Sequence, residues 1–253
     1  MEKPLVSIVT PCYNAGRFIS QTIDSVISQT YNNWEMIIVD DCSTDDSEHI
    51  INRYTDIEYR IKYIKLGKNS GSPAAPRNRA IQEAKGEIVA FLDADDLWKP
   101  NKLEVQLQKI LDDGCDIVYS NGEMIDENNQ YIRQMIKVKK TDYKRTLKHD
   151  ELSCSSVVIK KDLIGDCRFE NKKMEDLIFW LKVLKNTGAV AWNANAVLYS
   201  YRVVSNSRSR NKIEIIKSFW NVLRKEENLS FFYALYCFLS YLWINFNKYY
   251  VSR

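Results

Sequence analysis

The chain has 253 residues, 45% of them hydrophobic and 27% charged, which is ordinary for a folded globular protein and excludes a mostly disordered or fibrous one. Its net charge of +3, from 36 basic and 33 acidic residues, is too small for the basic surface that nucleic-acid binding requires. The six scattered cysteines and two histidines predict neither a zinc site nor a disulfide framework. Because no long apolar secretory signal follows Met1, we expect a cytoplasmic protein.

The first 120 residues alternate short β-branched segments with segments of helical periodicity, which is typical of parallel strands connected by helices. The expected strands are Leu5–Thr10, Glu35–Asp40, Ile61–Leu66, Ile88–Asp93 and Cys115–Asn121. The expected helices cover residues 16–29, 44–54 and 73–85. This order predicts an α/β fold in which a Rossmann-like, mostly parallel sheet is flanked by helices.

The pattern becomes less regular after about residue 122. Apolar and β-branched residues favour strands at Gln130–Val138 and Ser153–Lys160. Residues 174–186 have helical periodicity, and Gly188 is placed to end that helix. We expect this part of the chain to complete the site that the first half begins.

The C-terminal part predicts two helices. Residues 212–228 are amphipathic and basic, whereas Leu229–Asn247 is a run of nineteen residues without a charge, rich in aromatic side chains. Its serines, asparagines and tyrosines suit an interface better than a bilayer core, and basic residues flank it, so we expect a helix lying on a membrane surface. A packed C-terminal helix or an oligomer interface is the alternative.

The strongest chemical motif is Asp93-Ala94-Asp95-Asp96, where an apolar strand ends in acidic side chains. Neighbouring carboxylates repel one another, and a hard cation among their oxygens removes that repulsion. Mg²⁺ or Mn²⁺ bound by one or two carboxylates usually completes its shell with substrate phosphates. We therefore expect Asp93 and Asp95 to hold such a metal with a diphosphate. The alternative is a solvated turn that caps the helix beginning near Pro100.

Other polar residues are expected at the same edge of the sheet. Asp40 ends the second strand, and the first strand ends in a segment that contains Pro11, Tyr13 and Asn14. Carboxyl ends of parallel strands share one crevice, so a ring for stacking, an amide and a carboxylate are expected to converge there. Arg77 follows a glycine-containing turn and supplies a cation that could meet a diphosphate.

These motifs resemble the family 2 inverting glycosyltransferases of GT-A fold. The resemblance rests on Val6–Asn14, Ile38–Asp45, Arg77-Asn78 and Asp93–Asp96. It implies a UDP-sugar donor, with Asp40 near the uracil, Asp93 near the ribose and the metal, and Asp95 as a metal ligand. Ala94 belongs to the same donor-binding turn, and the implied cofactor is Mn²⁺ or Mg²⁺.

Glu175 and Asp176, at the start of a predicted helix, resemble the family's Glu-Asp motif. In that motif the aspartate accepts the proton of the acceptor hydroxyl, so the resemblance assigns the base to Asp176, with Glu175 beside it. Inversion needs one such base and one Lewis acid for the departing diphosphate. The alternative is that both acids only complement the helix dipole.

Residues 201–209 resemble the family segment that follows the acceptor site. Val204 stands where that segment often has a histidine, which leaves Arg202 and Arg208 as the expected phosphate contacts. The substitution also puts in doubt the role of this segment as a closing lid.

The predicted organisation is a GT-A catalytic domain at residues 1–210 and a helical tail at 211–253, for which membrane association is expected. Within the domain, residues 1–120 are expected to bind the nucleotide-sugar and residues 121–210 the acceptor. The resemblance implies transfer, with inversion, to a hydroxyl of a surface-polysaccharide acceptor of the O-antigen or capsule kind. That acceptor is expected to be a glycan or a polyprenyl-diphosphate-linked sugar, which places the enzyme peripherally on the inner face of the cytoplasmic membrane.

Two other functions fit parts of the pattern. A sugar-phosphate nucleotidyltransferase also uses metal-bound aspartates and would release pyrophosphate, but such enzymes usually have a glycine-rich basic loop, and none precedes Cys12. A non-catalytic scaffold would bind nucleotide-sugar without turnover, a function for which Asp176 would be unnecessary. The sequence predicts neither the donated sugar nor the oligomeric state.

Overall fold

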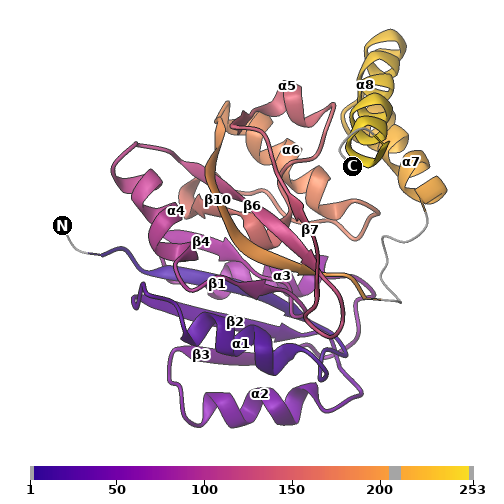
Figure 1. Ribbon diagram of the computed structural model, residues 1–253. Coiled ribbons are helices and arrows are strands. Elements are labelled where there is room, and N and C mark those ends of the chain that lie inside the picture. Colours follow the sequence, from indigo (N-terminus) through magenta and orange to yellow (C-terminus); the bar gives the residue numbers. More distant parts are fainter. Residues whose placement is uncertain (1–2, 205–211, 251–253) are drawn as a thin grey trace.

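The computed structural model describes residues 3–204 and 212–250. Its sheet consists of β1 (Val6–Cys12), β2 (Trp34–Asp40), β3 (Ile61–Lys65), β4 (Ile88–Phe91), β5 (Leu97–Trp98), β6 (Ile117–Ile125), β7 (Tyr131–Met135), β8 (Lys140–Thr141), β9 (Val158–Lys160) and β10 (Ala191–Arg202). Their order is β3-β2-β1-β4-β9-β6-β10-β5, with β7 beside β6 and β8 beside β10 (Figure 1).

The helices follow the sequence pattern closely. They are α1 (Ile19–Ile27), α2 (Ser47–Thr55), α3 (Ala74–Glu83), α4 (Lys102–Leu111), α5 (Tyr143–Thr146), α6 (Glu175–Thr187), α7 (Lys212–Asn221) and α8 (Phe231–Tyr250). Short 3₁₀ turns, η1 (Cys154–Ser156) and η2 (Lys161–Leu163), flank β9, and a π-helical turn, η3 (Val222–Glu226), follows α7. Gly188 ends α6 with φ 67°, as its position in the sequence indicates.

Strand direction differs in part from the prediction. The pairs β3–β2, β2–β1, β1–β4 and β6–β10 are parallel, but β9 lies antiparallel between β4 and β6. The sheet is therefore mixed, and a strand over all of Ser153–Lys160 is wrong, because residues 154–156 form η1. A strand that is buried on both faces has the same apolar pattern in either direction, so the sequence does not reveal which way β9 runs.

Two apolar cores cover the two faces of the sheet. Ile8 of β1 packs with residues of α1, α2 and α4 on one face, while its neighbour Val9 packs with residues of α3 and α6 on the other. This alternation follows from the two-residue period of a strand. Both faces of the central strands are thus covered by helices.

Gly86, in the turn before β4, allows that turn to lie directly against β1. A Cβ atom at this position would lie 2.3 Å from the carbonyl oxygen of Leu5 and 2.8 Å from the amide nitrogen of Ser7. Both are backbone atoms that cannot rotate away. We therefore expect Gly86→Ala to lower the free energy of unfolding by about 3 kcal/mol, measured by urea denaturation.

Gly67→Ala is the matched control, because no atom lies within 4 Å of the position that its Cβ would take. We expect this control to change the free energy of unfolding by less than about 0.5 kcal/mol. Equal effects of the two substitutions would contradict the close contact at Gly86.

The C-terminal helices pack against α6. Leu177, Ile178 and Leu181 of α6 form a third apolar core with residues of α7, η3 and α8, among them Ala234 and Cys237. The two predicted C-terminal helices are thus confirmed, and one face of α8 is a packed face. Within residues 3–204 and 212–250, none of the helices has the length and apolarity that crossing a membrane requires.

Candidate active site

The predicted convergence of strand ends is confirmed for β1 and β2. Their parallel register pairs Cys12 with Asp40, so the segments that follow both strands begin side by side. Beyond the strands, the backbone amide of Asn14 donates to the Ser43 hydroxyl at 2.9 Å, and the Thr44 amide donates to the Asn14 side chain at 2.8 Å. These contacts join the two loops into one wall of a crevice.

The residues expected around the base of a nucleotide differ in exposure. Asp40 is fully buried and accepts hydrogen bonds from the Ser43 amide at 3.0 Å, the Ser43 hydroxyl and the Tyr63 hydroxyl at 2.8 Å. Pro11 is buried within β1, whereas Tyr13 is 53% exposed. Asp40 therefore holds the loop after β2 in place through buried hydrogen bonds. Tyr13, in the loop after β1, presents an exposed aromatic ring that is available for stacking.

Unusual backbone conformations occur around this crevice. Asn14, Cys42 and Met174 have φ angles of 48°, 62° and 60°. Cysteine and methionine have none of the local hydrogen bonding that makes a left-handed conformation acceptable for asparagine, so these positions are strained. Such strain is often found at functional sites, where the surrounding structure holds a side chain in place.

The acidic turn Asp93–Asp96, which follows β4, is held by hydrogen bonds from α1 on one side and from Ser155 on the other. The Thr22 hydroxyl of α1 donates to the carbonyl oxygens of Ala94 and Asp96, both at 2.9 Å. On the other side, the Asp93 amide donates to the Ser155 hydroxyl at 3.1 Å. The Asp96 side chain is buried and accepts a hydrogen bond from the Arg202 amide at 2.9 Å, so Asp96 is part of the support.

Arg77 connects the two halves of the predicted site. Its guanidinium group is buried and lies 2.7 Å from the Asp93 carboxylate and 3.4 Å from the Glu175 carboxylate. Asp176, the next residue along α6, is within electrostatic reach of both Arg77 and Asp93. The acid expected at the donor and the acids expected at the acceptor are therefore brought together around one cation.

The Arg202 side chain is engaged by other protein groups rather than exposed as a phosphate contact. Its guanidinium group is buried and donates to the carbonyl oxygen of Asp95 at 2.7 Å, to Gln21 at 3.0 Å and to Asn129. These contacts hold the acidic turn from inside. Arg208, the other expected contact, lies outside the described residues.

Asp95 and Asp176 have raised pKa values. Burial, together with the neighbouring Asp93 carboxylate, raises the pKa of Asp95 to about 6. Burial also raises the pKa of Asp176, while Arg77 acts in the opposite direction. The crevice therefore contains more negative charge than its own cations compensate, which favours a cationic ligand.

The residues present fit a divalent metal. The carboxylate of Asp95 receives a hydrogen bond from no other side chain in the described part of the chain, and carboxylate oxygens are suitable ligands for Mg²⁺ and Mn²⁺. Residues 3–204 and 212–250 contain no cluster of three or more potential ligand side chains. Mg²⁺ held by one or two carboxylates usually completes its shell with waters and substrate phosphates, and a diphosphate could supply the latter here.

The segment from residue 149 to 156 is a functional element that the sequence did not reveal. Besides supporting Asp93, Ser155 accepts the indole hydrogen bond of Trp98 at 2.9 Å through its carbonyl oxygen. Asp150, in the same segment, is an electrostatic neighbour of Asp176. The run of small residues at 153–156 is the available signal in the sequence, although its pattern favours a strand there.

Asp150 is expected to make stability depend on pH. Burial and the neighbouring Asp176 raise its pKa to about 7. The unfolded chain loses this proton near pH ~4, so the native state loses stability as the pH rises from about 4 to about 7. We expect Asp150→Asn to raise the melting temperature more at about pH 7.5 than at about pH 5, measured by calorimetry. An equal gain at both pH values would contradict this.

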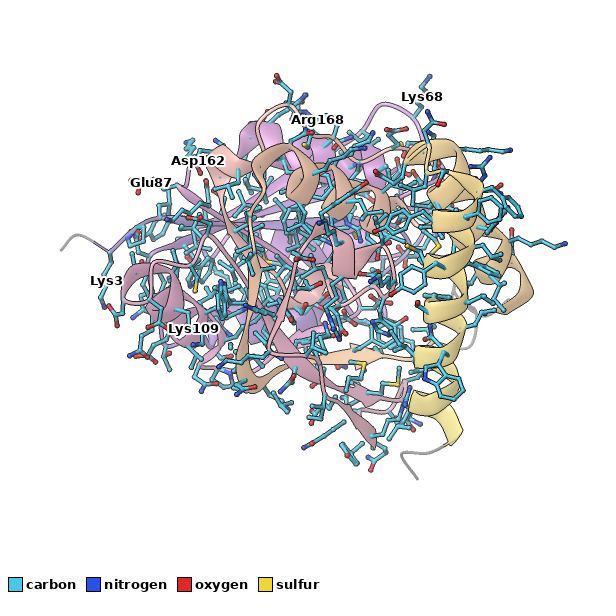
Figure 2. The ribbon with its side chains drawn as sticks, turned by 90° about the horizontal axis from the view of Figure 1, so that it is seen from above. Lys3, Lys68, Glu87, Lys109, Asp162 and Arg168 are labelled. Atoms are coloured by element: carbon cyan, nitrogen blue, oxygen red, sulfur yellow. The ribbon has the colours of Figure 1, made fainter. Side chains whose placement is uncertain are left out.

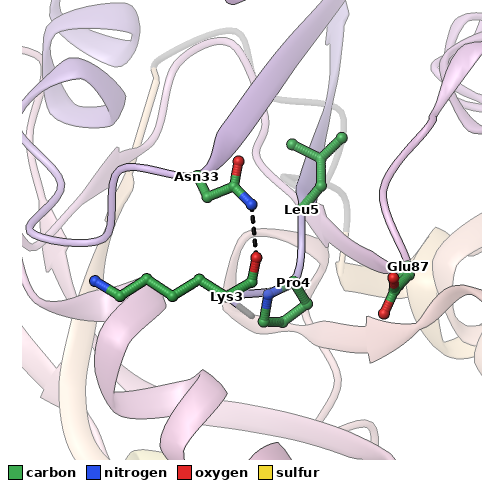
Figure 3. A pocket seen from close by; sticks show the side chains of 5 residues that line it. All are labelled: Lys3, Pro4, Leu5, Asn33 and Glu87. Carbon is green, nitrogen blue, oxygen red and sulfur yellow. Dashed lines mark hydrogen bonds between the residues drawn. The ribbon is translucent and has the colours of Figure 1, made fainter. Parts of the chain in front are cut away.

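The pocket drawn in Figure 3 is not at this site. It is lined by Lys3, Pro4, Leu5, Asn33 and Glu87, with a hydrogen bond of 2.7 Å from the Asn33 side chain to the Lys3 carbonyl oxygen. These residues precede β1, β2 and β4, so the pocket lies at the amino ends of the parallel strands. Ligand crevices of such sheets lie at the carboxyl ends.

Comparisons with known proteins identify the family of the chain. Residues 7–179 match the family described as Glycosyl transferase family 2. TuaG of Bacillus subtilis, whose name assigns it to teichuronic acid biosynthesis, is 39% identical over 94% of this chain and 95% of its own. WfgD of Escherichia coli, named UDP-Glc:alpha-D-GlcNAc-diphosphoundecaprenol beta-1,3-glucosyltransferase, is 34% identical over 98% of this chain and 96% of its own.

Solved structures share the fold. TarS of S. aureus in complex with UDP-GlcNAc superposes with a TM-score of 0.74 and 23% identity, covering 94% of this chain and 71% of TarS. The mannosyltransferase PcManGT of Pyrobaculum calidifontis, in complex with GDP-Man and Mn²⁺, has a TM-score of 0.69 at 19% identity, over 90% of this chain and 66% of its own. These likenesses confirm the expected GT-A, Rossmann-like fold.

Proposed function

The chain belongs to glycosyl transferase family 2 and is a glycosyltransferase, and from this premise we propose that it transfers one sugar from a UDP-sugar to a hydroxyl group of a surface-polysaccharide acceptor, with inversion. The observation that carries the proposal is the contact of Arg77 with both Asp93 and Glu175. It places the acidic turn for the donor beside the first turn of α6, where the acceptor base is expected.

In this proposal the donor lies in the crevice between the loops after β1, β2 and β4. Tyr13 stacks on the uracil, and Asp40 acts through the loop that it holds, together with Asn14. Asp93 and Asp95 hold the divalent metal with the diphosphate. Residues 1–120 thus form the donor half and residues 121–210 the acceptor half of one catalytic domain.

We assign the base to Asp176. Its raised pKa makes it a better proton acceptor than an ordinary solvated carboxylate, and the start of α6 directs it toward the crevice. As the acceptor oxygen bonds to the anomeric carbon, the bond from that carbon to the diphosphate oxygen breaks, and the hydroxyl proton passes to Asp176. One displacement inverts the configuration, and UDP is the leaving group.

The chain's own residues also prepare that displacement. Arg77 keeps Asp93 and Glu175 in fixed positions, and Thr22 and Arg202 keep the acidic turn rigid. The divalent metal, when bound at Asp93 and Asp95, supplies Lewis acidity that neutralises the departing diphosphate.

We further propose that the acceptor is carried on a polyprenyl diphosphate. The support comes from WfgD, whose name states a diphosphoundecaprenol-linked acceptor and which matches nearly the whole chain. An acceptor of this kind is anchored in a bilayer, so the enzyme would work peripherally on the inner face of the cytoplasmic membrane.

The test is the release of UDP from a panel of UDP-sugars with Mn²⁺ and a lipid-diphosphate-sugar acceptor, with and without chelator. We expect release with one donor, and its loss when the chelator is added. Release of pyrophosphate from a nucleoside triphosphate and a sugar phosphate would instead identify a nucleotidyltransferase. Metal-dependent UDP binding without turnover on any acceptor would favour a binding scaffold.

A further inference from the structure

The outer face of α8 is an exposed aromatic stripe, which we define as Phe232, Tyr236, Leu239 and Trp243. These residues are spaced by four, three and four positions, so they share one side of the helix, and they are 82%, 54%, 55% and 67% exposed. Figure 2 shows α8 as an outermost element of the protein, with its side chains projecting from the fold. Such a continuous apolar face is unusual for a surface that meets only water.

The apolar surface broadens beside the stripe. Ile216 and Trp220 of α7 and Phe231, Leu235 and Phe238 of α8 line an apolar hollow of about 590 Å³ between the two helices. Lys217 lies at the same hollow. The combination of apolar side chains with a flanking cation matches an interface between hydrocarbon and charged headgroups.

A cationic segment adjoins the stripe on the side of α5. Residues 139–148 contain five basic residues (Lys139, Lys140, Lys144, Arg145 and Lys148) and one acid, Asp142. The segment reaches α8 directly, because the Lys148 ammonium group lies 3.3 Å from the Tyr236 hydroxyl and 4.8 Å from its ring centroid. Lys144 and Arg145 are exposed.

Acids close to this segment have partners of their own, and Asp150 and Glu151, which follow it, are largely buried. Glu226 and Glu227, at the start of the turn before α8, are paired with Lys172 at 2.7 Å and Lys185 at 2.9 Å. Asp142 accepts the Arg145 amide hydrogen bond as the cap of α5. The surface that includes the stripe and the α5 segment is therefore both apolar and positively charged.

We propose that the aromatic stripe of α8 and the cationic segment of α5 together form one surface that binds an anionic membrane, and that this surface orients Asp176 toward the lipid headgroups. Charge complementarity selects the membrane as the occupant, because an anionic leaflet attracts clustered Lys and Arg while the stripe enters the interface. The inference rests on the proposed function in taking the acceptor to be lipid-linked.

The orientation follows from packing on the opposite face of α8. Ala234 and Cys237 of α8 are buried against Leu177 and Ile178 of α6. Those two residues directly follow Asp176 in the sequence, so α8 is joined through this shared apolar core to the turn that carries the proposed base. A bound bilayer would therefore have a fixed position relative to the acceptor side of the crevice.

The experiment is flotation of the full chain with vesicles of phosphatidylcholine alone and of phosphatidylcholine with phosphatidylglycerol. We expect binding to the anionic vesicles and weaker binding to the neutral ones. The double substitution Phe232→Ser and Trp243→Ser is expected to lower the partition coefficient at least about tenfold. Lys144→Gln with Arg145→Gln is expected to lower it about fivefold for each cation removed, on anionic vesicles only.

The matched control replaces Ile57 and Tyr59 by Ser, because these residues are 80% and 92% exposed at the turn between α2 and β3, far along the chain from α8. We expect this variant to bind vesicles as the wild type does. The inference is overturned if the wild type stays free of anionic vesicles, or if the stripe variant binds as well as the control. A wild-type dimer that becomes monomeric in the stripe variant would assign the stripe to a second copy instead.

Failure of this inference can be told apart from failure of the proposed function. UDP binding with Mn²⁺, measured without vesicles, is expected to be the same in the wild type and the stripe variant. Transfer to a water-soluble acceptor by a protein that does not bind vesicles would overturn only the membrane surface. Vesicle binding by a protein that turns over no UDP-sugar would overturn only the proposed activity.

Discussion

Replacing Asp176 by Asn is expected to slow sugar transfer by about a thousandfold while leaving the affinity for UDP within about twofold of the wild type. The amide cannot accept the proton of the acceptor hydroxyl, but it has nearly the same size as the carboxylate. The donor crevice is built from Thr22, Asp93 and Arg77, whose contacts the substitution does not remove. The measurements are kcat for transfer and calorimetric titration with UDP.

Asp162→Asn is a matched control for this substitution, because Asp162 is exposed in η2, away from the crevice (Figure 2). We expect the control to keep full activity. If the Asp176 variant lost UDP binding in parallel with transfer, Asp176 would be part of the donor site and its assignment as the base would be wrong.

Replacing Asp95 by Ala is expected to abolish metal-dependent UDP binding and to lower transfer by about a thousandfold or more. Arg77 lies 2.7 Å from the Asp93 carboxylate and already balances part of its charge, so Asp95 is expected to be the stronger of the two proposed metal ligands. Burial and the neighbouring Asp93 carboxylate raise the pKa of Asp95 to about 6, and a bound cation would favour its ionised form. UDP titrations with Mn²⁺ and with EDTA measure the effect.

Asp113→Ala is the control for Asp95→Ala, since Asp113 lies on the surface after α4, paired only with Lys109 at 3.1 Å. It is expected to bind UDP with the same metal dependence as the wild type. Unchanged metal dependence in the Asp95 variant would contradict the role of Asp95 as a metal ligand.

The sequence predicts which strand ends meet because of one property of parallel strands. Segments after the first, second and fourth strands meet at one edge, so Asn14, Asp40 and Asp93 can be grouped without knowing any contact. The contacts that support them could not be predicted. Thr22 is 72 residues from Ala94, and Asp93 is 62 residues from Ser155, so no local pattern connects them.

The role that the sequence motif suggests for Arg202 differs from the contacts that its side chain makes. The resemblance of residues 201–209 to the family segment suggests a phosphate contact for this arginine, whereas the structure places its guanidinium group against the carbonyl oxygen of Asp95. The sequence contains no signal for this burial, because Arg202 ends β10, a strand with several polar residues that the apolar pattern did not predict.

The uncharged run Leu229–Asn247 predicts either a helix on a membrane surface or a packed helix. The two interpretations concern opposite faces of α8. The packed-helix interpretation is confirmed for the face that contains Ala234 and Cys237, which are fully buried in an apolar core shared with α6 and α7. The opposite face carries the exposed stripe, for which membrane binding remains a prediction. Periodicity could separate the two faces only after the partner of the inner face was known.

The most direct test of the account is nuclear magnetic resonance of the reaction product formed from an α-linked UDP-sugar and a lipid-diphosphate-sugar acceptor in the presence of Mn²⁺. The account predicts a new β-glycosidic linkage and stoichiometric UDP, because one displacement with Asp176 as base inverts the anomeric carbon. An α-linked product would contradict direct displacement at this site, and pyrophosphate in place of UDP would contradict glycosyl transfer by this crevice.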